Sequence, residues 1–311
     1  MGGVDGGISR HYGRRCLETL HVRFLRYSAF YTPLLLTLAP ERLAAEGLKA
    51  TFDRSTPDRT IEAGLQDGTV QVAQSAPAVN FEPSIRGAAP DVRHFALLNS
   101  RDGFFLAARD VDAPFSWAVL EGRSVVVDHF FQPLAMFRAA LRDRGVDARK
   151  VKLIDAGEPA GIEAAFRAGQ GDFVHMQGPA PQLMEREGLG RVVASVGATV
   201  GPVAFSSLCA RPAWLATGEA RAFMRVFRRA RLDAVEAPAA ELARQIASFL
   251  PNVPLEVLGR TIAMYQTIDA WRGDVTITPE LYERTVDIFV QTGHIAARPS
   301  MADVVMAPPP V

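Results

Sequence analysis

The sequence predicts an α/β protein of two lobes, on three observations. Apolar, strand-like runs alternate with helix-like segments over 21–73, in the order strand, helix, strand, helix, strand. The same alternation starts again near Phe104. The chain has 311 residues, which suffices for about two domains with cores of their own. Since parallel strands need a crossover between them, we expect each lobe to hold a mostly parallel sheet with helices on both faces.

The first half of the chain supplies three strands and two helices. They are expected at 21–25, 34–46, 49–53, 61–66 and 70–73. The first helix carries five leucines and ends before Gly47, a residue type that suits the position just after a helix. The third strand is entered through Asp67-Gly68, a turn dipeptide.

The second half repeats this pattern and then becomes helical. An apolar segment opens it, and strand-like and helix-like segments follow, at 104–108, 124–127, 133–144, 151–154, 163–167, 173–175, 179–187, 192–195 and 204–210. Four helices come next, at 218–235, 238–249, 254–264 and 279–291. Three of the four open on a proline, which suits the first helical turn. The proline-rich tail, 301–311, is expected to be disordered.

Composition and charge exclude several classes of protein. Apolar residues make up 48% and charged residues 22%, the proportions of a globular rather than a disordered chain. The 34 basic and 34 acidic residues cancel, which argues against a nucleic-acid partner. Two cysteines, Cys16 and Cys209, are too few for a disulfide framework and match no metal spacing, so we expect no metal or cofactor.

The first 20 residues carry three arginines but lack the apolar stretch of a secretory signal. The longest apolar runs fall far short of the roughly 20 residues of a membrane span. As written, the sequence predicts a cytoplasmic protein, and a periplasmic one if an export signal precedes it.

Five motifs occur in an order typical of a known family, at 26–33, 46–48, 64–73, 120–127 and 168–174. The first is the aromatic loop RYSAFYTP, and the last is the segment AGQGDFV of the second half. In this order the motifs resemble the type II periplasmic solute-binding proteins of the group that takes up sulfonates, nitrate and thiamine-pyrimidine precursors. The resemblance covers 21–295 and departs from the family at Gln71, where the family has an aspartate.

The resemblance implies a two-lobed periplasmic-binding-protein fold with a ligand cleft between the lobes. Two crossover segments are expected near 104–108 and 204–210, and the C-terminal helices are expected to return to the first lobe. The expected division is an N-terminal extension, a discontinuous first lobe, a second lobe and a flexible tail, at 1–20, 21–105 with 207–298, 106–206 and 299–311. The implied function is reversible capture of a small solute by a monomer that serves an ABC permease and its ATPase, without a covalent step.

Candidate ligand contacts are the residues that follow strands, because ligands of open α/β sheets bind outside the carboxyl ends of strands. They are Ser28, Phe30, Tyr31, Gln74, Ser75, Asp128, His129, Phe130, Met176, Gln177 and Phe205. Aromatic faces with a few amide and hydroxyl groups suit a small aromatic solute, and Arg26 nearby suits an anionic one.

Each candidate also has a structural interpretation. The aromatic residues can belong to the core, and Gln74 and Ser75 can satisfy backbone groups at a strand end. Asp128 and His129 can form a catalytic pair, or they can simply precede the helix that carries Pro133. His175 is interpreted as a strand residue whose ring is hydrogen-bonded.

Two alternatives to transport stay open. One is a cytoplasmic enzyme on the same fold, of the decarboxylase or desulfinase kind. Desulfinase-like chemistry needs a cysteine in the first cleft loop, and 26–33 contains none. Decarboxylation needs only an acid such as Asp128 or His129. The other alternative is a soluble ligand sensor.

Overall fold

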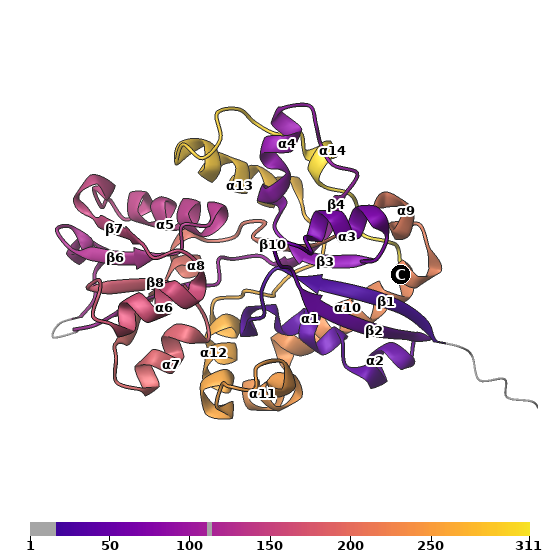
Figure 1. The fold of residues 1–311 in the computed structure, drawn as a ribbon, viewed down its shortest axis with the longest axis horizontal. Coiled ribbons are helices and arrows are strands. Elements are labelled where there is room, and N and C mark those ends of the chain that lie inside the picture. Colours follow the sequence, from indigo (N-terminus) through magenta and orange to yellow (C-terminus); the bar gives the residue numbers. More distant parts are fainter. Residues whose placement is uncertain (1–16, 111–113) are drawn as a thin grey trace, which may run out of the picture.

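Two five-stranded sheets form the framework of the computed structural model, which describes residues 17–110 and 114–311 (Figure 1). The first sheet has the order β2-β1-β3-β10-β4, with β1 Glu18–Phe24, β2 Leu48–Arg54, β3 Val72–Ser75, β4 Arg93–Asn99 and β10 Ser206–Ala210. The second has the order β7-β6-β8-β5-β9, with β5 Phe104–Ala108, β6 Ser124–Val127, β7 Lys152–Asp155, β8 Phe173–Gln177 and β9 Arg191–Ser195.

Both sheets are mixed rather than mostly parallel. In the first, β1 pairs in parallel with β2 and β3, and β10 pairs antiparallel with β3 and β4. In the second, β6 pairs in parallel with β7 and β8, and β5 pairs antiparallel with β8 and β9. The antiparallel pairs arise because the chain enters each sheet from the other lobe, through β5 and β10.

The crossovers between the lobes lie a few residues before the segments expected. The first comprises residues 100–103, between β4 and β5, and the second comprises 201–205, before β10. The segment 104–108 is itself strand β5, next to the edge strand β9 of its sheet. Most of the segment 204–210 is likewise strand β10, next to the edge strand β4.

The helices of the lobes are short. They are α1 Thr32–Thr37, α2 Pro40–Ala44, α3 Ile61–Asp67, α4 Phe81–Ile85, α5 Phe131–Asp143, α6 Pro159–Arg167, α7 Ala180–Arg186 and α8 Val196–Val200. The single helix expected over 34–46 is two helices, because Pro40 begins the second one. Ala39 before it is extended, as residues that precede proline prefer to be. The described residues also form five 3-10 turns, η1 Ala29–Tyr31, η2 Pro77–Asn80, η3 Trp117–Leu120, η4 Ala148–Lys150 and, after α11, η5 Ala247–Phe249.

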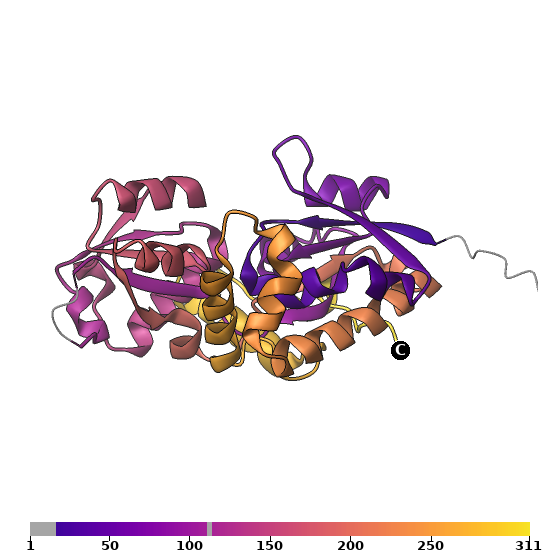
Figure 2. The same cartoon turned by 90° about the horizontal axis from the view of Figure 1, so that it is seen from below.

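The C-terminal helices contact both lobes. They are α9 Pro212–Leu215, α10 Gly218–Glu236, α11 Ala239–Ile246, α12 Leu255–Thr267 and α13 Pro279–Gln291. Helix α10 packs on α1 of the first lobe, whereas α12 contacts α7 and α13 contacts α5 of the second. Figure 2 shows the gold helices at the junction of the two lobes and the orange helices along the first lobe. One apolar cluster accordingly runs through both lobes, from Phe24 to Phe137 to Tyr265.

The expectation of a disordered tail at 299–311 is wrong. Helix α14, Met301–Val304, is followed by a parallel bridge between Val305 and His94 of β4. Val304 is buried, and the Met306 N–H donates to the His94 carbonyl at 3.1 Å. The tail is therefore held by backbone contacts with the edge strand β4, although it is rich in proline. At the other end, Glu18 to Leu20 of the expected extension belong to β1, and 1–16, with Cys16, lie outside the described residues.

Within 17–110 and 114–311, no helix combines the length and the apolar character that a membrane crossing requires.

Candidate ligand-binding cleft

The loop after β1 reaches across to the second lobe. The Ser28 hydroxyl caps η1 by accepting from the Phe30 N–H at 3.0 Å, and it donates to the Gly178 carbonyl at 2.6 Å. The Tyr31 hydroxyl lies 3.4 Å from Nε2 of Gln177, at the end of β8. Ser28, Tyr31 and Gln177 were expected at the cleft, and the structure brings them together.

An ion pair joins the lobes beside these contacts. The Arg26 guanidinium lies 3.0 Å from Oδ2 of Asp128, which is buried at the end of β6. The other oxygen of Asp128 accepts from the Phe130 N–H at 2.9 Å, just before α5 begins. Asp128 therefore precedes α5 and closes a turn before it, but the helix has no side-chain cap, and the carboxylate has an interlobe partner as well.

His129 and Phe130 lie at the edge of this group. His129 is half-buried, with Nδ1 at 3.2 Å from the Val127 carbonyl and 3.5 Å from Asp155. Phe130 is 47% exposed, and the Arg26 guanidinium carbon lies 6.0 Å from its ring centre. An exposed aromatic ring beside the ion pair offers a flat apolar face to a ligand.

Phe30 and Phe205 belong to the core between the crossovers. Their ring centres are 5.6 Å apart, and Phe30 also packs against Tyr265 at 4.9 Å. A Cβ atom at Gly103, in the first crossover, would lie 2.6 Å from the Phe30 ring. Glycine at that position allows the crossover to pass directly over the ring.

Tyr265 of α12 ties the crossover to the second lobe. Its buried hydroxyl donates to the Gly103 carbonyl at 2.9 Å and accepts from the Gly178 N–H at 2.9 Å. Since Gly178 also accepts from Ser28, one short loop after β8 is held from two directions.

Gln74, Ser75 and Met176 lie within strands rather than in loops. Gln74 orients the loop after β1, because its Oε1 accepts from the N–H groups of Leu25 at 3.1 Å and Arg26 at 3.5 Å. Met176 is buried in a separate apolar cluster with Phe166 of α6.

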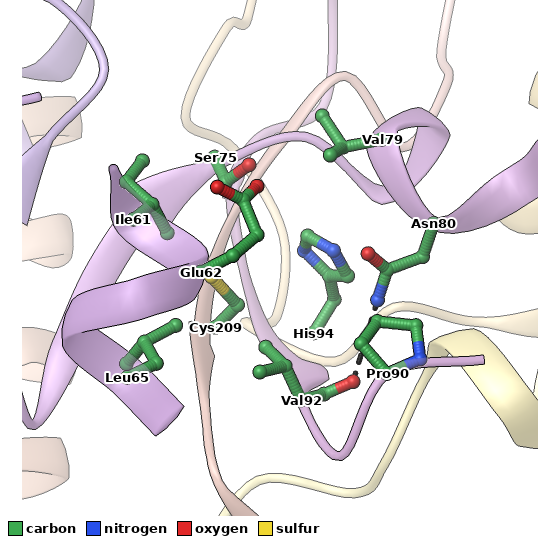
Figure 3. Close-up of a pocket in the computed structure, with 10 residues that line it drawn as sticks. All are labelled: Ile61, Glu62, Leu65, Ser75, Val79, Asn80, Pro90, Val92, His94 and Cys209. Carbon is green, nitrogen blue, oxygen red and sulfur yellow. Dashed lines mark hydrogen bonds between the residues drawn. The ribbon is translucent and has the colours of Figure 1, made fainter. Parts of the chain in front are cut away.

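Ser75 lines a small cavity of the first lobe (Figure 3). The cavity lies between α3 and η2 and offers about 10 Å³ of space, room for one water molecule at most. Cys209 and His94 line it too; burial raises the pKa of the Cys209 thiol, and it lowers the pKa of His94 to about 3. The cavity is too small for an organic solute.

Several buried polar atoms beside the crossovers lack partners among the residues that the structure describes. They are Asn99 Oδ1, Asp102 Oδ2, Gln132 Oε1, Gln177 Oε1 and both ring nitrogens of His175. The expectation of a hydrogen-bonded His175 ring is wrong, because the ring lies between Phe104 at 4.7 Å and Phe137 at 4.9 Å. Buried polar groups are normally paired, so this concentration of exceptions points to a site.

Burial is the largest cause of the pKa shifts of Asp102, His175 and Tyr31. It raises the pKa of Asp102 well above its usual value, and the nearby Asp128 carboxylate raises it further. It lowers the pKa of His175 to about 4, partly opposed by Asp128. Burial likewise raises the pKa of Tyr31. The positive charge of Arg26 opposes this rise, and the negative charge of Asp128 adds to it.

Asp102, Gln132 and Tyr265 are residues that the sequence analysis missed. Asp102 lies in the first crossover, and the Gln132 amide nitrogen donates to the Phe205 carbonyl of the second at 2.9 Å. A correct placement of the crossovers would have found Asp102. Nothing in the local pattern around Tyr265 indicates its contacts with residues about 90 and 160 positions away.

No group of three or more His, Cys, Asp or Glu side chains suited to a metal ion occurs in the described part of the chain.

The two crossovers, the two sheets and the polar groups between them define a two-lobed type II periplasmic-binding-protein fold, which confirms the expected fold class. No family model matches the chain. Bacillus subtilis YtlA, named as a candidate binding protein, is 25% identical over 284 residues, covering 90% of this chain and 85% of its own length.

Two solved structures show the same fold. One is the zinc-bound ligand-binding component of an ABC-type import system from Staphylococcus aureus, with a TM-score of 0.74 and 15% identity over 93% of this chain and 97% of that one. The other is the alkanesulfonate-binding protein SsuA of Xanthomonas axonopodis pv. citri bound to MOPS, with a TM-score of 0.68 and 17% identity over 93% and 98%.

Proposed function

We propose that this chain reversibly binds a small organic solute between its lobes, as the substrate-binding component of an ABC-type importer. The observation that carries the proposal is the meeting of strand-end loops from both lobes, through Arg26 with Asp128 and Ser28 with Gly178. A ligand placed there contacts both lobes at once. Hinge movement about the two crossovers would then open and close the site.

The proposed contacts include six of the residues predicted from the sequence and three further residues. Ser28, Tyr31, Asp128, His129, Phe130 and Gln177 surround the interlobe contacts, with Arg26 beside them. The neighbouring unpaired atoms of Asp102 and Gln132 extend the set toward the crossovers. We assign Phe30, Gln74, Ser75, Met176 and Phe205 to packing and loop positioning.

The partners in this proposal are a membrane permease and its ATPase, served by a monomer. The similar S. aureus protein is a component of such a system. An importer captures its solute outside the cytoplasmic membrane, so the proposal places the protein there. Cell fractionation of the strain that carries the native gene tests this placement.

The function itself is tested by incubating the purified protein with a mixture of sulfonates, aminopyrimidines and aromatic carboxylates. Mass spectrometry then follows which compounds are retained and which are consumed. A compound retained in stoichiometric amount and recovered unchanged supports binding. Depletion beyond the protein concentration, with a new product, would make the chain an enzyme of the decarboxylase or desulfinase kind instead.

Tyr31 provides a site-specific test. If its ring packs on the ligand, Tyr31→Ala weakens binding of the retained compound by about 1–3 kcal/mol. Tyr27→Ala serves as the control, since Tyr27 lies in the same loop but packs against Phe24 at 5.0 Å. Equal affinities for the folded Tyr31→Ala variant and the wild type would remove Tyr31 from the site.

A further inference from the structure

The charge balance of the cleft limits which solutes it can hold. Arg26, the basic side chain of the loop after β1, is already paired with Asp128 at 3.0 Å. Asp128 is buried. An anion that recruited Arg26 would leave the Asp128 carboxylate buried without its counter-charge, which is strongly unfavourable.

The unpaired amide groups beside the cleft present acceptors. Gln132 directs its nitrogen to the Phe205 carbonyl at 2.9 Å, and Asn99 directs its nitrogen to the Phe30 carbonyl at 2.7 Å. These orientations are fixed, because a carbonyl can only accept. The amide oxygens of Gln132 and Asn99 are then left without donors within the described parts of the chain.

A buried oxygen without a donor is costly, and a ligand that supplies the donor recovers that free energy. A sulfonate or carboxylate supplies only acceptors, whereas an amine or amidine supplies several N–H groups. The exposed face of Phe130 beside Arg26 suits a flat, conjugated group of this kind.

Building on the proposed binding function, we infer that the cleft selects a small solute that donates hydrogen bonds and carries no negative charge, in particular an aromatic amidine or amine. The inference separates this chain from its structural neighbour bound to MOPS, a protein that binds alkanesulfonates. The two share a fold, at 17% sequence identity.

Three probes of nearly the same shape test the inference. They are benzamidine, which is cationic, benzamide, which is neutral, and benzoate, which is anionic. Calorimetric titration of the wild-type protein at neutral pH is expected to give benzamidine at least tenfold tighter than benzoate, with benzamide between them. The order does not depend on any variant folding correctly.

Asp128→Asn then tests the residue responsible. Asparagine keeps the oxygen that accepts from the Phe130 N–H, so the start of α5 is preserved. The variant leaves Arg26 without its counter-charge, and we expect benzoate to gain at least tenfold and benzamidine to lose at least tenfold in affinity. Asp233→Asn is the matched control, because it frees Arg42 in the same way on the outer surface of the first lobe and is expected to change neither affinity.

The outcomes separate the inference from the function on which it rests. Benzoate binding as tightly as benzamidine to the wild type overturns the inference and leaves solute binding intact. Failure of both benzamidine and benzamide to bind at millimolar concentration overturns it as well, whatever compound is retained from the mixture described above. Equal shifts in Asp128→Asn and Asp233→Asn would show that overall charge, rather than the Arg26 pair, sets the preference.

Discussion

Replacing Tyr265 by phenylalanine tests how the lobes are held together. The ring is fully buried against Phe30 at 4.9 Å and Trp271 at 5.8 Å, and phenylalanine preserves that packing. Only the hydroxyl is lost, and with it one hydrogen bond to the Gly103 carbonyl and one from the Gly178 N–H, both 2.9 Å long. Each of the two buried groups deprived of its partner costs about 1–3 kcal/mol, so Tyr265→Phe is expected to lower the free energy of unfolding by about 2–6 kcal/mol.

Urea unfolding followed by tryptophan fluorescence measures this difference, by linear extrapolation to water. Tyr282→Phe is the matched control, since that buried hydroxyl makes a single hydrogen bond of 3.3 Å, to the Pro299 carbonyl. A loss in Tyr265→Phe no larger than in the control would refute the role given to the hydroxyl as a link between α12, the first crossover and the loop after β8.

Three further predictions concern the crossovers and the buried polar groups. Gly103→Ala forces its Cβ into the Phe30 ring, and denaturant titration should show a loss of about 1–3 kcal/mol; unchanged stability would mean that the crossover moves freely. Asp102→Asn keeps the acceptor for the Phe104 N–H. Because the raised pKa of Asp102 makes the wild type lose stability as pH rises above the unfolded value of 3.8, the variant should gain in relative melting temperature as pH rises from 3.8, and parallel curves would contradict this. His175→Phe removes two unpaired nitrogens between aromatic rings, and we expect a gain of about 1–3 kcal/mol at pH 7. The gain should grow as pH falls from 6.5 toward the folded His175 pKa of about 4, where the wild type loses stability, and a variant less stable than the wild type would count against the interpretation.

Local patterns predicted most elements of the fold but not their pairing. Strands β1, β2, β6 and β7 lie within a few residues of the expected ranges, because an apolar run between turn residues is a local signal. Strand β4 was missed, and the position of β10 between β3 and β4 joins segments more than 100 residues apart. Such long-range pairing leaves no trace in the spacing of neighbouring residues.

Errors of two residues at strand ends account for much of the uncertainty in the site. Strand β3 was expected to end at residue 73 and ends at Ser75, so Gln74 and Ser75 are strand residues. Strand β8 was expected to end at residue 175 and continues to Gln177, which places Met176 in the strand. Successive strand residues point to opposite faces, so an error of one position decides between cleft and core. Ser28 and Asp128 follow the ends of β1 and β6, as the sequence predicts, and Ser28 contacts Gly178 of the other lobe while Asp128 pairs with Arg26.

The insertion of β10 between β3 and β4 has a consequence for synthesis of the chain. The five strands of the second sheet come from one continuous stretch, Phe104 to Ser195, and can assemble as soon as that stretch has left the ribosome. The first sheet begins earlier in the chain but cannot close until β10 arrives more than 100 residues after β4. During that interval β3 and β4 expose unpaired backbone edges, which readily join other strands. We therefore expect β1 to β4 to depend on chaperones while the second sheet, which is synthesised after them, folds first.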